Sequence, residues 1–164
     1  MDTNLKPLPE RFVYDSPLGP LAIGLDGGAV AELRFDAGAA PVLPAGHPLC
    51  ARLDAYFRDG SPLDDVEVQI GGGDFARRVG AVLRTIPAGE VRNYGWVAER
   101  AGHPRAARAV GRAVGANPVA ILVPCHRVVA RNGLGGYGGG LGRKEALLRL
   151  EKARRPGSLQ PIVG

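Results

Sequence analysis

The sequence predicts an α+β protein of two domains, and three observations favour this fold class. The first part of the chain contains short runs with the alternating pattern of β-strands. The second part contains apolar residues at helical spacing. Between them lies the glycine-rich stretch IGGGD at 70–74, which is typical of a loop. We therefore predict one domain over residues 1–71 and a second over residues 72–164 of the 164-residue chain.

The predicted first domain begins with three strands. The runs RFVYDS, PLAIGLD and AVAELRF are separated by PLGP and GG, and this punctuation indicates an antiparallel meander. The following segment HPLCARLDAYFRDG places Leu49, Leu53 and Phe57 four residues apart, which is the spacing of one helix face. A sheet with one covering helix is the expected result.

The predicted second domain is mainly helical. The segment 74–90 has one apolar stripe and reads as a core helix with Asp74 as its N-cap. Two shorter helical patterns follow at 93–102, where Asn93 is the expected cap, and at 103–118. Two short helices joined by a tight turn that contains glycine resemble a helix-turn-helix.

Charge is divided unevenly along the chain. The net charge is +5, but residues 1–71 hold 5 Lys/Arg against 11 Asp/Glu, whereas residues 72–164 hold 16 against 5. The second half therefore carries +11, nearly all of it as arginine, and such a field suits a polyanion such as nucleic acid. Arginine-rich usage in a GC-rich genome would affect both halves, so the asymmetry favours a partner.

The sequence gives no sign of a membrane or secretory route. No run approaches the ~18 apolar residues of a membrane-spanning helix, and the opening MDTNLKPLPERF lacks the pattern of a signal peptide. We expect a cytoplasmic protein, or a nuclear one in a cell with a nucleus. Cys50 and Cys125 are expected to be reduced thiols.

The pair Cys125 and His126 is the strongest candidate for chemistry. It follows NPVAILVP, which reads as a short strand bracketed by Pro118 and Pro124, so the pair is expected in a tight turn beyond the strand. A thiolate generated by an imidazole that a carboxylate biases is a common nucleophile. The ordinary alternative is that Cys125 is a small buried hydrophobe.

The segment RKEALLRLEKARR at 143–155 reads as a helix that offers the carboxylate. Glu151 falls on the apolar stripe of this helix, and a carboxylate on a core face needs a partner. From spacing alone, two readings stay equal: Glu151 biases the imidazole, or it ion-pairs with a basic residue of the same segment, namely Lys144, Arg154 or Arg155.

Four motifs together resemble one family. The stretches IPAGEVRNYGWVAERAG, PRAARAVG, NPVAILVPCHRVV and GGYGGGLGRKEALLRLE are similar in order and spacing to the 6-O-alkylguanine-DNA alkyltransferase family over about residues 74–152. SPLGPLAIGL looks like the start of the small ribonuclease-H-like α/β domain of that family. The resemblance implies a mainly helical C-terminal domain with a winged helix-turn-helix-like motif.

The resemblance also implies an activity: irreversible transfer of an alkyl group from the 6-oxygen of guanine, and from the 4-oxygen of thymine, to the protein itself. By the same resemblance, transfer would occur once per molecule, on a base flipped out of the duplex. Cys125 would be the alkyl acceptor and His126 its base, acting through a water and oriented by Glu151. Asn117 would link the recognition helix to the active-site turn.

Further residues are assigned to the substrate by the same resemblance. The lesion would contact Tyr94, the backbone of Val128, Tyr137 and Gly138. Arg108 would enter the duplex where the damaged base has left, with further DNA contacts from Arg105, Ala107 and Arg112. The implied partner is double-stranded alkylated DNA, bound through the minor groove by a monomer, with cooperative binding left open.

No cofactor and no metal are expected, because His47 and Cys50 have no second pair of ligands and read as helix residues. The family resemblance implies that Arg127 has a structural role and helps to brace the two domains. Trp96 and Phe75 are expected in the core.

Two rival functions remain. A module that recognises alkylated DNA without repairing it is disfavoured because its representatives lack the cysteine of this motif. An unrelated cysteine hydrolase would leave the basic half unexplained and lacks an identifiable oxyanion hole.

Overall fold

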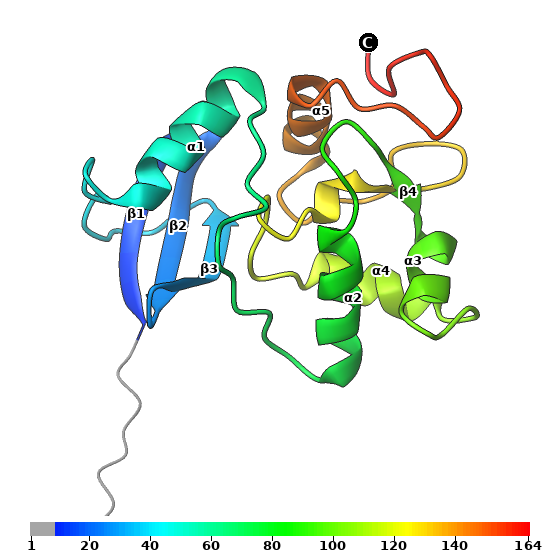
Figure 1. The fold of residues 1–164 in the computed structure, drawn as a ribbon, viewed down its shortest axis with the longest axis horizontal. Coiled ribbons are helices and arrows are strands. Elements are labelled where there is room, and N and C mark those ends of the chain that lie inside the picture. The colour runs from blue at the N-terminus through cyan, green and yellow to red at the C-terminus, as the bar shows by residue number, and fades with distance from the viewer. Residues whose placement is uncertain (1–8) are drawn as a thin grey trace, which may run out of the picture.

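The computed structural model describes residues 9–164 and confirms the α+β class (Figure 1). The first part contains β1 (Glu10–Ser16), β2 (Gly19–Asp26), β3 (Ala29–Phe35) and α1 (Pro48–Asp59). The strands pair in the order β1-β2-β3, each antiparallel to the next, as predicted. The predicted first domain starts at residue 1, and its first eight residues lie outside the described part of the chain.

Helix α1 packs on this sheet through its apolar face. It buries Leu49, Leu53 and Tyr56. The side chain of His47 accepts a hydrogen bond from the Leu49 N–H at 3.2 Å, so His47 is the N-cap and not the helix residue that we expected. Cys50 lies inside the helix, as predicted.

The second part of the chain is mainly helical. Its helices are α2 (Asp74–Arg84), α3 (Tyr94–Arg100), α4 (Ala107–Gly115) and α5 (Leu141–Leu150). The two-residue strands β4 (Arg92–Asn93) and β5 (Val128–Val129) form a short parallel pair. Helices α2, α3 and α4 pack against one another (Figure 1). No helix in residues 9–164 is both long enough and apolar enough to cross a membrane.

Helix boundaries differ from expectation at two places. Gly73, not Asp74, is the N-cap of α2, and the Asp74 carboxylate instead pairs with the Arg77 guanidinium one turn on. Helix α5 ends at Leu150, which makes Glu151 its C-cap. Asn93 caps α3 as predicted, since its side-chain oxygen accepts a hydrogen bond from the Trp96 N–H at 2.9 Å.

The segment 117–124 is not the strand that its apolar pattern predicted. It is a series of turns in which Ile121 adopts a positive φ of 68°. Its backbone bonds to the sheet at Leu33, which donates to the carbonyl of Pro118 at 2.9 Å and accepts from the Ala120 N–H at 2.8 Å. The segment is apolar because it is buried, and its turned backbone carries the chain from α4 to Cys125.

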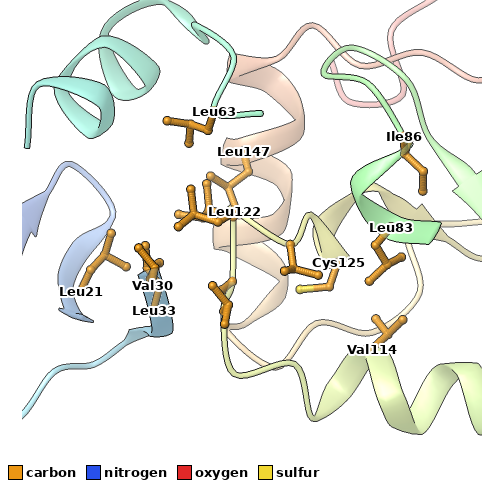
Figure 2. Close-up of a cluster of buried hydrophobic side chains, with 14 of the residues drawn as sticks. Leu21, Val30, Leu33, Leu63, Leu83, Ile86, Val114, Leu122, Cys125 and Leu147 are labelled. Atoms are coloured by element: carbon orange, nitrogen blue, oxygen red, sulfur yellow. The ribbon is translucent and has the colours of Figure 1, made fainter. Parts of the chain in front are cut away.

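One hydrophobic core spans both parts of the chain. Figure 2 shows Leu33 of the sheet, Leu122 of the turn segment and Leu83 of α2 converging on this core, with the sulfur of Cys125 among them. The connecting segment adds to it: a Cβ built on Gly80 would lie 2.6 Å from Ile70 Cγ2. Gly80 therefore lets the chain between the two parts pack directly on α2.

Candidate active site

Cys125 opens a short 3₁₀ helix (Cys125–Arg127), which is the tight turn that the sequence predicted. Cys125 is buried, with 4% of the residue exposed. Burial raises its pKa, while the side chain of Asn117 and the charge of Lys144 act in the opposite direction. At rest the sulfur is therefore held mainly as the thiol.

A hollow of about 180 Å³ gives access to this cysteine. Its walls come from four parts of the chain: the end of β3, the end of α4, the turn segment that leads to Cys125 and the glycine-rich segment after β5. The lining includes Phe35, Val114, Asn117, Cys125, Tyr137 and Gly138. The N-terminal sheet therefore contributes to the site that the C-terminal half contains.

His126 and Glu151 form a buried pair. His126 Nε2 lies 2.8 Å from Glu151 Oε1, and both side chains are fully enclosed. Burial opposes ionisation of the Glu151 carboxyl, but His126 and Arg127 together hold its pKa well below the usual range. Because an ionised carboxylate only accepts hydrogen bonds, Nε2 of His126 must be the donor in this pair. Nδ1 of His126 has no hydrogen-bond partner among the described residues, so it is the nitrogen left to receive a proton.

Glu151 also makes a two-point ion pair with Arg127. Arg127 Nε donates to Oε2 at 3.0 Å, and Nη2 donates to Oε1 at 2.9 Å. Both roles considered for Glu151 are therefore present in the structure: it contacts the His126 imidazole, and it forms an ion pair with a basic residue. That partner is none of the three that spacing suggested. Arg127 also donates to the carbonyl of Ile86 at 2.6 Å, so its hydrogen bonds stay within the C-terminal half and do not brace the two parts directly.

Tyr56, which sequence reasoning missed, links the N-terminal part of the chain directly to the buried carboxylate of this site. This residue of α1 is 1% exposed, and its hydroxyl donates to Glu151 Oε1 at 2.8 Å. Burial and the carboxylate both raise the pKa of Tyr56, so its hydroxyl stays protonated and remains a donor. The available signal was a tyrosine on the buried face of a helix, whose hydroxyl requires a partner. The sequence could not name a partner 95 positions away.

Asn117 ties the end of α4 to the cysteine turn. Its amide nitrogen donates to the carbonyl of Val123 at 2.8 Å and to that of Val119 at 3.4 Å, and its oxygen accepts from the Val119 N–H at 3.0 Å. Because it follows the C-cap of α4 by one residue, a displacement of that helix would be felt at Cys125.

Of the four residues expected to contact the lesion, Tyr137 and Gly138 line the hollow, whereas Tyr94 and Val128 are not among its lining residues. The hydroxyl of Tyr137 is buried, and its pKa is raised by burial and by Cys125. Gly138 lines the same hollow. Tyr94 is the first residue of α3 and is half-buried, and a Cβ built on Gly135 would lie 3.0 Å from its hydroxyl oxygen. Tyr94 therefore reaches the start of the glycine-rich segment.

The carbonyl of Val128 accepts a hydrogen bond from Lys144, a contact that sequence reasoning did not predict. Lys144 of α5 is fully buried, and its Nζ donates to the carbonyl of Val128 at 2.7 Å and to that of Gly136 at 3.0 Å. The lysine thus joins β5 to the glycine-rich segment. Burial lowers the pKa of Lys144 from 10.5 to about 8.

The lowered pKa of Lys144 predicts that stability depends on pH. Between pH 8 and about 10 the folded protein has released the Lys144 proton while the unfolded chain still binds it, so the free energy of unfolding contributed by this group rises with pH. Lys144→Met removes that rise. Urea unfolding of both proteins at several pH values in this window measures the difference. Parallel curves for the two proteins would contradict the lowered pKa.

The candidate DNA contacts lie on and just before α4. Arg108 and Arg112 are exposed and one turn apart, so they share a face of the helix, and Ala107 is its first residue. Arg105 is exposed too, but it lies in the turn before α4, because the helix begins only at Ala107, later than we expected. The opposite face of α4 buries Val110 and Val114 in the core.

Comparison with known proteins identifies relatives over most of the chain. The family described as "6-O-methylguanine DNA methyltransferase, DNA binding domain" matches residues 74–153. A Mycobacterium tuberculosis protein named methylated-DNA–protein-cysteine methyltransferase is 46% identical over 154 residues, which cover 88% of this chain and 93% of that protein.

Solved structures agree with the sequence match. The crystal structure of the M. tuberculosis O6-methylguanine methyltransferase superposes with a TM-score of 0.78 at 43% identity, covering 92% of this chain and 96% of the other. The M. tuberculosis OGT crystallised in complex with DNA gives a TM-score of 0.78 at 44% identity, over 90% and 95% of the two chains. With nearly half of its residues identical along almost the full length of such a relative, the chain belongs to the methylated-DNA–protein-cysteine methyltransferase family.

Proposed function

We propose that this protein repairs DNA by transferring a methyl or other alkyl group from the 6-oxygen of guanine to the sulfur of its own Cys125. The observation that carries the proposal is a buried thiol at the wall of an open hollow, followed directly in the chain by the His126–Glu151 pair. The family, with its relatives named for this reaction, supports the same assignment.

The proposed chemistry is a displacement at the alkyl carbon. The Cys125 proton passes through one water to Nδ1 of His126, and Glu151 stabilises the resulting imidazolium. The thiolate attacks, so a sulfur–carbon bond forms as the carbon–oxygen bond breaks, and the electron pair goes to the purine. The Tyr94 hydroxyl and the Gly138 N–H stabilise that charge, and the departing guanine finally takes up a proton. A thioether remains, and no group at the site can cleave it.

The lesion is proposed to reach the hollow by base flipping. The 6-oxygen of guanine is inside the base stack, so the nucleotide must rotate out, which costs a few kcal/mol. Arg108 fills the space that it leaves, with Arg105, Ala107 and Arg112 beside it on the minor-groove side. Tyr137, Gly138 and the backbone of Val128 enclose the flipped base, and alkylated thymine is a second substrate.

The proposal also covers the oligomeric state, the domains and the location of the protein. The protein acts as a monomer on double-stranded DNA. Its two domains are residues 1–71 and 72–164. The cytoplasm is the proposed location, a reducing compartment that suits the two unpaired thiols Cys50 and Cys125.

The decisive experiment is intact-mass measurement after incubation with a duplex that carries one 6-O-methylguanine. We expect a stoichiometric gain of one methylene on the Cys125 peptide, and no gain with the undamaged duplex of the same sequence. Binding of the lesion duplex without any change in mass would instead identify a damage-recognition module and refute the transfer activity.

A further inference from the structure

A second basic surface lies on the outer side of α3, apart from the hollow at Cys125. An open hollow of about 500 Å³ is lined by Arg92, Trp96 and Arg155, together with Val91, Asn93, Val129 and Pro156. A neighbouring hollow of about 390 Å³ shares Arg155 and adds Arg131. The two hollows meet at Arg155. With Arg100, which lies against Trp96, we call the basic and aromatic residues here the arginine–tryptophan surface: Arg92, Trp96, Arg100, Arg131 and Arg155.

Trp96 arranges two of these arginines. The guanidinium carbons of Arg92 and Arg100 lie 5.2 and 5.0 Å from the centre of the indole ring, which is cation–π distance. We expected Trp96 in the core, and it does pack against the core, but the ring is partly exposed and covered by guanidinium groups. Stacking limits the rotamers of both arginines, so less conformational entropy is lost when they bind an anion.

The arginines are held in place but little neutralised. Arg92 donates to the Glu90 carboxylate at 2.6 Å, whereas Arg155 donates to two neutral carbonyls, those of Ala130 and Gly133, both at 3.1 Å. Within residues 9–164, no carboxylate lies at ion-pair distance from Arg100, Arg131 or Arg155. The surface therefore offers donors and net positive charge to an outside anion.

Its position connects it with the proposed DNA contacts. Tyr94 and Trp96 are two residues apart on α3, so they point to different sides of the helix. Tyr94 reaches the glycine-rich segment beside the active site, and Trp96 faces outward. Helix α3 packs on α4, which carries Arg108 and Arg112. Figure 1 shows α3 and β4 at the edge of the molecule farthest from the N-terminal sheet.

We infer that the arginine–tryptophan surface binds the sugar–phosphate backbone of the DNA that flanks the lesion, at a site separate from α4. The inference rests on the proposed action on DNA. Guanidinium groups spread over the arginine–tryptophan surface fit a chain of phosphodiesters better than a single anion, since each group then finds its own phosphate. Backbone contacts of this kind position a protein without reading sequence.

Trp96 also supplies the probe, since it is the sole tryptophan of the chain. Its fluorescence is expected to change on titration with an undamaged duplex. Arg100→Ala and Arg155→Ala should each weaken duplex binding several-fold, and each should lower the slope of log K against log salt by about 0.9. The methyl-transfer rate at saturating lesion DNA should be unchanged, because neither residue touches the hollow at Cys125.

The matched control is Arg58→Ala. Arg58 is an exposed arginine of α1, so its replacement alters net charge equally on the opposite part of the molecule. If Arg100→Ala and Arg155→Ala bind DNA like Arg58→Ala, with the same salt slope, the inference is wrong. Normal methyl transfer by all three variants would show that this failure leaves the proposed function intact.

Two further comparisons locate the contact. Shortening the duplex stepwise on either side of the lesion should, at one length, remove the difference between the parent protein and Arg155→Ala. A difference that persists down to the shortest duplex would contradict contact with flanking DNA. A titration with a mononucleotide tests a free phosphate as the occupant: saturation of the Trp96 signal by the mononucleotide, without a response to the duplex, would also overturn the inference.

Discussion

Cys125→Ser is expected to abolish methyl transfer, a loss of more than roughly 10⁴-fold, while the protein still binds the lesion duplex. A serine hydroxyl fills nearly the same volume, so the fold should remain, but a hydroxyl is a far weaker nucleophile than a thiolate, and the imidazole cannot ionise it to a useful extent. Single-turnover assays with excess protein, read as loss of 6-O-methylguanine from the duplex, measure the rate.

Cys50→Ser is the matched control for this prediction. Cys50 is the other free thiol, and it lies in α1 outside the hollow. It should therefore keep the parent rate. Residual transfer by Cys125→Ser that disappears only when Cys50 is also replaced would show that the wrong cysteine has been assigned.

Glu151→Gln is expected to cost about 3–5 kcal/mol in the free energy of unfolding, because it leaves the buried Arg127 guanidinium without its carboxylate. The substitution also places an amide next to three donors, from Tyr56, His126 and Arg127. Loss of the charge that stabilises the imidazolium should slow methyl transfer as well. Urea unfolding and single-turnover kinetics on the same preparation measure the two effects.

Tyr56→Phe is the conservative comparison for this site. It removes one hydroxyl and keeps the ion pair, so a loss of only about 1–2 kcal/mol is expected. A Glu151→Gln protein as stable as Tyr56→Phe would mean that Glu151 is not ionised in the folded state.

Acid unfolding gives an independent check of the same carboxylate. The pKa of Glu151 is lower in the folded protein than in the unfolded chain. The stabilisation of the folded state by its ionised carboxylate is therefore complete above the ordinary glutamate pKa, and it is lost as pH falls below that value. The parent protein should therefore lose more stability than Glu151→Gln below about pH 4. Equal acid sensitivity of the two proteins would contradict the lowered pKa.

Local patterns predicted most of the secondary structure. The three strands, the cap at Asn93 and the helix pair all depend on residues close together in sequence, where alternation and capping act directly. The segment 117–124 was misread because burial gives strands and buried turns the same apolar composition. What bends it is the side chain of Asn117, whose bonds to Val119 and Val123 replace those of a ladder.

The site was only partly visible from sequence. The Cys125–His126 pair and the buried position of Glu151 could be read, and the resemblance supplied the contact between His126 and Glu151. Tyr56 and Lys144 could not be predicted, because their partners are carbonyl and carboxylate oxygens that only the fold brings near. Each has a long side chain with a polar end, and in sequence such residues look like ordinary helix positions.

The enclosure of Cys125 determines how long an unused molecule stays usable. A protein that reacts once is wasted whenever its sulfur meets the wrong electrophile, and peroxides or small free alkylating agents react with exposed thiolates. Here Cys125 is 4% exposed and the pKa of its thiol is raised by burial, so peroxides and free alkylating agents meet little exposed thiolate. A lesion bound in the hollow lies next to the sulfur, so burial of Cys125 does not keep the lesion from it. The number of active molecules in a cell should therefore fall with the amount of damaged DNA rather than with the age of the protein.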